Sequence, residues 1–137
     1  MKQVQNGKNN NTMKQITLIL ALLVTTLTFA QNKNAKASME VDGVCGMCKE
    51  RIEKAAIRTK GVKSAVWNVD THELKLIYDE RKTDLKTISK HIAAVGHDTK
   101  EIKATDEAYD SVHPCCRYRD TDVVKDHDGE KKAESKN

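Results

Sequence analysis

The chain has 137 residues, of which 32% are charged, and its mean hydropathy is −0.67, so it is long enough for one small domain and too short for two. It has 24 basic and 20 acidic residues and a formal net charge of +4. Aromatic residues make up only 4% of the chain and no basic stretch interleaves with them, which argues against a nucleic-acid partner.

An apolar run near the N-terminus predicts export. A lysine follows Met13, the run covers residues 16–29, and a small-x-small pattern ends at Ala30. A basic start, about fourteen largely apolar residues and such a pattern are typical of a secretory signal peptide. The run is short for a membrane span, which needs about 20 residues. We therefore expect residues 1–30 to be an N-terminal lead and signal peptide cleaved after Ala30, with translation starting at Met13; an uncleaved anchor helix is the alternative.

Export changes how the rest of the chain is interpreted. Cleavage removes three basic residues and no acidic ones, which lowers the net charge from +4 to +1. The mature protein is expected to be periplasmic or secreted. Such compartments are oxidising and favour disulfides, so the four cysteines can serve as ligands or form disulfides.

The first half of the mature chain alternates between strand and helix patterns. Residues 31–37 are polar, and we expect a flexible lead-in. Residues 38–42 alternate apolar and acidic side chains, which predicts a strand. From Cys48 onward, apolar residues recur with spacings of four and three in a charged segment. This spacing predicts an amphipathic helix that stops at Gly61.

The second half predicts a hairpin, a helix and a last strand. Residues 62–69 and 74–78 alternate apolar and polar side chains around an Asp-Thr-His turn. A second amphipathic helix begins at a Thr-Asp capping pair and stops at Gly96, and residues 99–104 form a weak strand pattern. The predicted fold over residues 38–104 is α+β, a ferredoxin-like βαββαβ sandwich with an antiparallel sheet and two helices on one face.

The C-terminal tail, residues 105–137, is charged, and we expect it to be largely disordered. It contains His113, Cys115 and Cys116, which could hold a soft metal ion. In the predicted fold the last strand runs away from Cys45, so the tail would leave about 20 Å from it. A return would need an almost taut chain. A site shared with Cys45, a separate metal site, a disulfide to a partner and a pair without a metal role all stay open.

Cys45 and Cys48 lie where the first strand pattern gives way to the first helix pattern. The N–H groups and dipole of a helix N-terminus favour thiolates there. Two thiolates bind soft ions such as Cu(I) or Hg(II). The same spacing is used by redox sites, and the pair could close as a disulfide in an oxidising compartment.

Residues 39–103 resemble the heavy-metal-associated domain family, which includes copper chaperones, N-terminal modules of metal-pumping ATPases and the periplasmic mercury-binding protein. The family's Gly-Met-x-Cys-x-x-Cys motif, Gly-Val pair and Gly-Tyr-Asp-like turn correspond to residues 42–48, 61–62 and 96–98. The resemblance implies the ferredoxin-like fold, a metal site at the two cysteines of the motif, and transfer of the ion to a partner's thiolates.

Two positions depart from the family's pattern, and a third differs from the zinc- and cadmium-type variants within it. Gly43 replaces the motif's Met, which packs under the metal loop in the family, so the loop is expected to be looser. His97 stands where Tyr, Phe or Lys is common. Because that turn lies beside the metal loop, His97 is a candidate third ligand or gate, and a solvated turn residue is the alternative. Val44 precedes the first cysteine in place of an Asp found in zinc- and cadmium-type variants.

The function predicted from these features is capture and transfer of Cu(I) by an exported protein that is not an enzyme. Hg(II) and Zn(II) are the other ions considered. A mercuric ion scavenger, a periplasmic thiol–disulfide exchange protein and a module that only docks a membrane partner are the alternatives. The expected partner is a metal-transporting membrane protein or another metal-binding domain, and the apo protein is expected to be monomeric. The candidate ligands are Cys45 and Cys48, with further candidates at His97, His113, Cys115 and Cys116.

Overall fold

The computed structural model describes residues 31–134, with side chains described through residue 128. The predicted signal peptide lies in residues 1–30, outside the described residues. Within residues 31–134, no helix combines the length and apolar character needed to cross a membrane.

A three-stranded antiparallel sheet forms the base of the domain, in the order β1-β3-β2. The strands are β1 (Ala35–Glu40), β2 (Val62–Trp67) and β3 (Glu73–Tyr78). The predicted hairpin is therefore present as β2 and β3. The first strand begins inside the stretch predicted as a flexible lead-in, because Ala35 pairs with Tyr78 at the end of β3 and is itself buried. The expectation of a lead-in over residues 31–37 is wrong for its last three residues.

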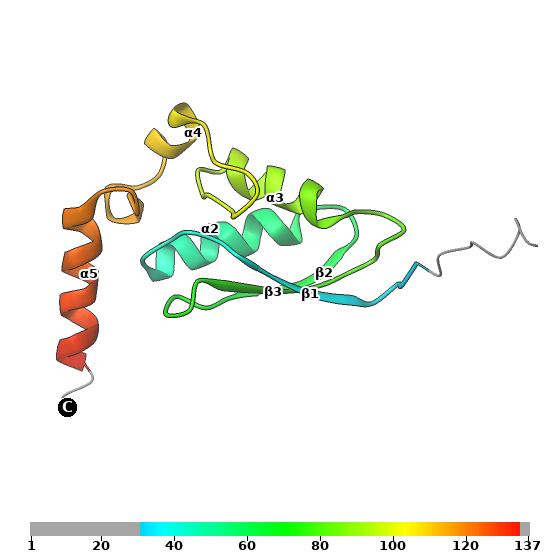
Figure 1. The fold of residues 1–137 in the computed structure, drawn as a ribbon, viewed down its shortest axis with the longest axis horizontal. Helices are drawn as coiled ribbons and strands as arrows, with labels where there is room; N and C mark the ends of the chain where they lie inside the picture. The colour runs from blue at the N-terminus through cyan, green and yellow to red at the C-terminus, as the bar shows by residue number, and fades with distance from the viewer. Residues whose placement is uncertain (1–30, 135–137) are drawn as a thin grey trace, which may run out of the picture. The chain divides into compact units, whose positions relative to one another are not determined.

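Two helices cover one face of the sheet (Figure 1). Helix α2 (Gly46–Ile57) buries a stripe that includes Cys48 and Ile52, and α3 (Leu85–Ala94) buries one that includes Ile88 and Ile92. The capping prediction is confirmed, since the Asp84 side chain accepts a hydrogen bond from the Thr87 backbone N–H at 2.7 Å. An antiparallel sheet with both helices on one face is the predicted ferredoxin-like fold.

The fourth strand predicted over residues 99–104 is reduced to a single bridge between Val41 and Thr99. Thr99 is bonded to Ile102 through both its backbone N–H (2.8 Å) and its side chain, so the chain turns back within four residues. A local turn thus replaces extended pairing along β1. Because the strand is not formed, the tail after residue 104 does not continue along the edge of the sheet as predicted.

Within the described residues, the tail contains three helical segments, which differs from the largely disordered segment that we expected. It contains α4 (Asp106–Asp110), the 3-10 helix η1 (Pro114–Cys116) and α5 (Thr121–Glu134). Val112 and Cys116 are buried with the domain core, at 3% and 1% exposure. Burial of these two side chains stabilises the tail against the domain, which the charged composition alone did not predict.

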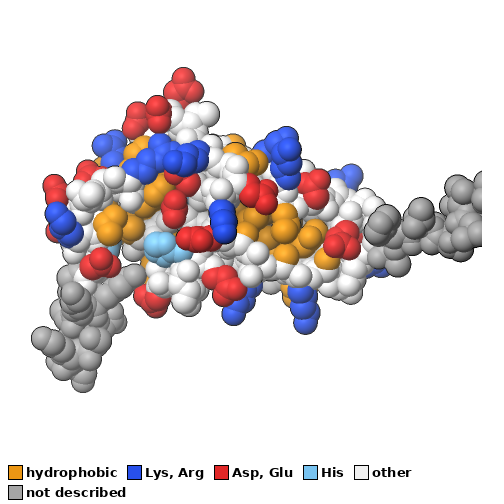
Figure 2. All heavy atoms as spheres, in the orientation of Figure 1, with side chains coloured by type: hydrophobic (Ala, Val, Ile, Leu, Met, Phe, Trp, Pro, Cys, Tyr) orange, Lys and Arg blue, Asp and Glu red, His pale blue; other side chains and the backbone are white. Residues whose placement is uncertain are grey.

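Figure 2 shows acidic and basic side chains interspersed on the face toward the viewer.

Trp67 packs against the loop that leads into α2, beside Gly43. The Trp67 indole N–H donates to the backbone oxygens of Val41 (3.0 Å) and His72 (3.2 Å). A Cβ placed on Gly43 would lie 3.0 Å from the Cβ of Cys48 and 3.1 Å from the Trp67 ring. Gly43 therefore leaves room for the indole, and the indole packs the loop that was expected to be looser.

This packing predicts that Gly43→Ala destabilises the protein by about 1–3 kcal/mol, because the added methyl group overpacks the space between Trp67 and Cys48. Gly46→Ala is the matched control, since a Cβ at Gly46 meets no atom within 4 Å. Chemical denaturation followed by Trp67 fluorescence measures both variants. Equal stability of Gly43→Ala and the parent would contradict the packing account.

Candidate metal centre

The start of α2 brings two thiols together. Cys45 is the N-cap residue of α2, with extended backbone, and Cys48 lies in the first turn. Their sulfurs are 3.4 Å apart, and both cysteines are free thiols. Cys48 is fully buried and accepts a hydrogen bond from the Val44 backbone N–H at 3.5 Å, whereas Cys45 is half-buried. A ligand from solvent therefore meets Cys45 first.

The two thiols of this pair differ in acidity. Burial acts to raise the pKa of Cys45, but hydrogen bonds from the backbone and thiol of Cys48 and from the Cys116 thiol outweigh it and lower that pKa. Burial raises the pKa of the Cys48 thiol above its usual range. Cys45 is thus the member of the pair that forms a thiolate more readily. Cys48 stays protonated until a bound metal ion displaces its proton.

The tail places a second pair of thiols against Cys45. The Cys45 sulfur lies 3.6 Å from that of Cys116 and 3.9 Å from that of Cys115, which are 4.0 Å from each other. These three ligand atoms lie within 4.8 Å of one another. The thioether sulfur of Met47 is 3.6 Å from the Cys115 sulfur. Of the arrangements left open by the sequence, the structure has the one in which the tail thiols meet Cys45.

The tail reaches this position because it never follows a long final strand. The expectation that it leaves about 20 Å from Cys45 is wrong, since the chain turns at residues 99–102. It then packs on Gly96, where φ is +94° and a Cβ would lie 2.5 Å from both the Ala108 oxygen and the Val112 side chain. Only glycine allows this approach and this backbone conformation.

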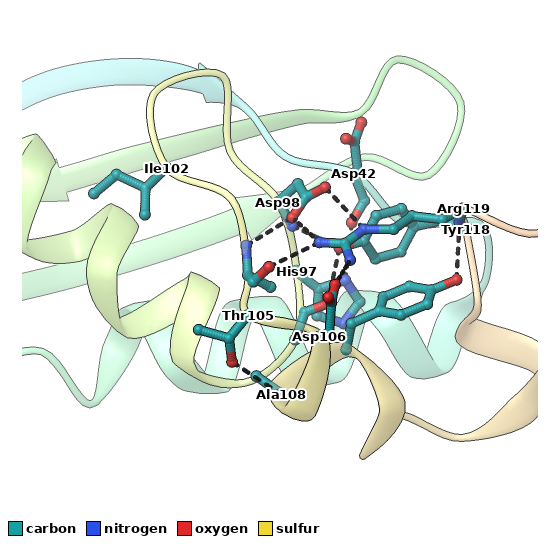
Figure 3. A network of polar contacts seen from close by, with 12 residues as sticks. Asp42, His97, Asp98, Ile102, Thr105, Asp106, Ala108, Tyr118 and Arg119 are labelled. Atoms are coloured by element: carbon teal, nitrogen blue, oxygen red, sulfur yellow. Dashed lines mark hydrogen bonds and ion pairs between the residues drawn. The ribbon is translucent and has the colours of Figure 1, made fainter.

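A polar network holds the tail to the turn after α3 (Figure 3). The Arg119 guanidinium donates to both Asp98 carboxylate oxygens, at 2.8 and 3.2 Å, and to the Ala104 carbonyl oxygen at 2.9 Å. The Tyr118 hydroxyl donates to the Gly96 carbonyl oxygen and accepts from the Asp98 N–H, both at 2.9 Å. These contacts fix the chain just after Cys115 and Cys116.

His97 lies beneath the loop and outside the thiol cluster. It is fully buried, its ring stacks on Tyr118 at 5.6 Å, and its Nδ1 donates to the Asp42 carbonyl oxygen at 2.8 Å. Burial lowers the pKa of His97 and favours the neutral ring. Its Nε2 has no hydrogen-bond partner among the described residues. The structure gives His97 a packing position and does not include it in the group of ligand atoms around Cys45.

His113 contacts one thiol of the tail without joining the cluster. Its Nδ1 lies 3.2 Å from the Cys115 sulfur and accepts a weak hydrogen bond from the Cys115 N–H at 3.4 Å. The ring is exposed. His113 therefore caps η1 and orients Cys115.

The sequence interpretation missed the residues that dock the tail. Two of the three Tyr, Tyr109 and Tyr118, lie in the segment expected to be disordered. They contact each other edge to face at 5.2 Å, and the Arg119 guanidinium lies 4.3 Å from the Tyr109 ring centre. That concentration of a scarce residue type beside two cysteines was the available signal.

Comparison with known proteins places the metal loop in a known family. A profile of the heavy-metal-associated domain matches residues 38–98. A copper-exporting P-type ATPase of Staphylococcus haemolyticus is 32% identical over 73 residues, 53% of this chain and 9% of the ATPase. A zinc-transporting ATPase of Synechocystis is 38% identical over 68 residues, 49% of this chain and 9% of that protein. The chain thus spans about a tenth of the length of these relatives.

Smaller relatives match over nearly their whole length. The copper chaperone CopZ of Staphylococcus haemolyticus is 29% identical over 63 residues, 45% of this chain and 93% of the chaperone. A solved structure described as a CopZ metallochaperone is 29% identical, with a TM-score of 0.46 over 47% of this chain and 98% of that one. These matches cover about half of this chain.

The Asp98–Arg119 pair predicts that stability is lost in acid. Burial acts to raise the pKa of Asp98, but the Arg119 guanidinium and the Ala104 N–H outweigh it and lower that pKa. Because the pKa is lowered on folding, the ionised carboxylate contributes stability above the unfolded pKa of about 3.9. That contribution shrinks below this pH and is lost as the pH falls through the folded pKa. Denaturation from pH 7 downward should show Asp98→Asn less stable than the parent at pH 7, with the difference narrowing below about pH 4. A constant difference would contradict this role.

The position of His97 predicts that it is not needed as a ligand. His97→Phe keeps the stacking on Tyr118 and should change Cu(I) affinity by less than about tenfold, or 1.4 kcal/mol. Competition with a Cu(I) chelator measures this, with Cys45→Ser as the positive control. A loss as large as that of Cys45→Ser would make His97 a ligand.

Proposed function

We propose that this chain, whose residues 38–98 match the heavy-metal-associated domain, is an exported carrier of Cu(I). It binds the ion through Cys45 and Cys48 and passes it to a metal-transporting membrane protein or another metal-binding domain. The observation that carries the proposal is the pair of free thiols 3.4 Å apart at the N-terminus of α2. The relatives that match this segment include a protein named as a copper chaperone.

Binding begins at Cys45, the accessible thiol with the lowered pKa. The ion then reaches the buried Cys48, whose raised pKa means that it binds by releasing a proton. Two protonated thiols that bind one Cu(I) ion release two protons, so affinity rises with pH. Thiolates select soft ions, which favours Cu(I) over the hard divalent cations.

Transfer uses the accessible side of the pair. A thiolate of the partner attacks the ion at Cys45, and the ion moves through states in which it is bonded to sulfurs of both proteins. Cys48 leaves last because it is buried. These steps exchange ligands without a general acid, general base or covalent nucleophile, so we assign no enzyme activity.

The choice of Cu(I) rests on soft ligands and on copper-related names among the relatives. One relative is named as a zinc transporter, and Hg(II) binds the same two thiolates, so both ions belong in the test. Export rests on the apolar run at residues 16–29 and the small residues that end at Ala30.

Thiol–disulfide exchange is the second candidate function. An accessible cysteine with a lowered pKa beside a buried cysteine is also the arrangement of a redox pair. This activity needs Cys45 and Cys48 to cycle between dithiol and disulfide. Turnover with a disulfide substrate would identify it.

The test is an anaerobic titration of the reduced protein with Cu(I), Hg(II) and Zn(II) in competition with chelators. We expect tight binding of Cu(I), lost in Cys45→Ser and weakened in Cys48→Ser, because each variant removes one ligand of the pair. Circular dichroism checks that both variants fold, since Cys48 is in the core. Binding of Cu(I) no tighter than by glutathione, together with turnover of a disulfide substrate, would replace the carrier function with redox exchange.

A further inference from the structure

We propose that the tail is a built-in retention arm: Cys115 and Cys116 form a second ligand set with Cys45, so the docked tail keeps the ion and its release requires the tail to open. This inference rests on the proposed function, because it concerns the same ion at Cys45. It adds a second site and a way to regulate the first.

The spacing of the three sulfurs suits a bound ion. Three thiolates around one ion at metal–sulfur bonds of about 2.3 Å are about 3.8–4.0 Å apart, whether the site is a face of a tetrahedron or a plane. The sulfurs of Cys45, Cys115 and Cys116 are separated by 3.6, 3.9 and 4.0 Å. Little movement is needed for all three to bind one soft ion.

Cys45 belongs to two overlapping ligand sets. Its sulfur is 3.4 Å from that of Cys48 on one side and 3.6 Å from that of Cys116 on the other. A shared ligand allows an ion to pass from one set to the other without leaving the protein. The bond from the ion to Cys48 breaks as a bond to Cys115 or Cys116 forms. The incoming thiol loses a proton and the departing thiolate takes one up, so charge balances.

The tail also limits access to the ion. Cys116 is 1% exposed, and its sulfur lies 3.6 Å from that of Cys45, the thiol that a partner's thiolate would attack. Cys115 is half-buried and contacts the Met47 thioether at 3.6 Å. A partner must displace this segment or accept the ion from it. The docked state therefore retains the ion and the opened state transfers it.

The contacts that hold the tail are separate from the ligands. Arg119 and Tyr118 fix it to the turn at Gly96 and Asp98 through hydrogen bonds of 2.8 to 3.2 Å. Replacing either side chain removes contacts that hold the tail, while all four cysteines are still present in the variant. This separation makes the retention role testable.

The experiment loads the full mature chain with one equivalent of Cu(I) and measures affinity and the rate of release to a Cu(I) chelator. We expect Cys115→Ser to weaken binding by about tenfold or more and to speed release. Arg119→Ala and the milder Tyr118→Phe should speed release with every thiol present. Arg117→Ala is the matched control, since Arg117 is an exposed neighbour outside the docking network, and it should behave as the parent.

The outcomes separate this proposal from the carrier function. Loss of binding in Cys45→Ser and Cys48→Ser, with parental affinity and release in Cys115→Ser, Tyr118→Phe and Arg119→Ala, would overturn the retention arm alone. Parental binding in Cys45→Ser and Cys48→Ser would overturn the carrier function. Circular dichroism excludes unfolding, and Tyr118→Phe serves if Arg119→Ala does not fold.

Discussion

The ion pair between Asp98 and Arg119 is the contact on which the thiol cluster depends. It joins the turn after α3 to the residue three places beyond Cys116, at 2.8 Å, and the Asp98 carboxylate also accepts a hydrogen bond from the Ala104 N–H at 2.7 Å. The carboxylate is buried, so leaving it without the guanidinium would be costly. This cost, together with the close packing of the tail on Gly96, returns the chain to the metal loop.

The docked tail changes what the metal loop can do. A lone pair of thiols at the start of a helix is accessible to solvent and to partners. Here the half-buried thiol of Cys45 also lies 3.9 Å from the sulfur of Cys115 and 3.6 Å from that of Cys116. The same ligand exchange that transfers an ion between proteins can then take place within one chain. In this proposal the protein retains the ion when the tail is docked and transfers it when the tail opens.

The sequence predicted the parts of the molecule that depend on local patterns. Periodicity and capping predicted both helices and the hairpin, and the spacing of Cys45 and Cys48 indicated that their thiols lie side by side. The tail could not be predicted this way, because its order comes from contacts between residues about 20 positions apart, such as Asp98 with Arg119. A weak strand pattern after Thr99 was overridden by a local turn to Ile102. That single change moved the tail from the far end of the domain to the metal loop.

Gly43 and His97, the two departures from the family motif, are both closely packed. Trp67 packs against Gly43, and Tyr118 stacks on His97, so each of them contacts an aromatic residue distant in sequence. The motif alone suggested a loose loop at Gly43 and a third ligand at His97. The contacts of Trp67 and Tyr118 instead give both residues a role in packing.

The most direct test of whether the tail thiols bind the ion together with Cys45 is X-ray absorption at the copper edge of the protein loaded with one equivalent of Cu(I). The account predicts three sulfur neighbours in the parent protein, and two with shorter bonds when Cys115 and Cys116 are both replaced by Ser. Two sulfur neighbours in both proteins would contradict it, because the tail thiols would then take no part in binding.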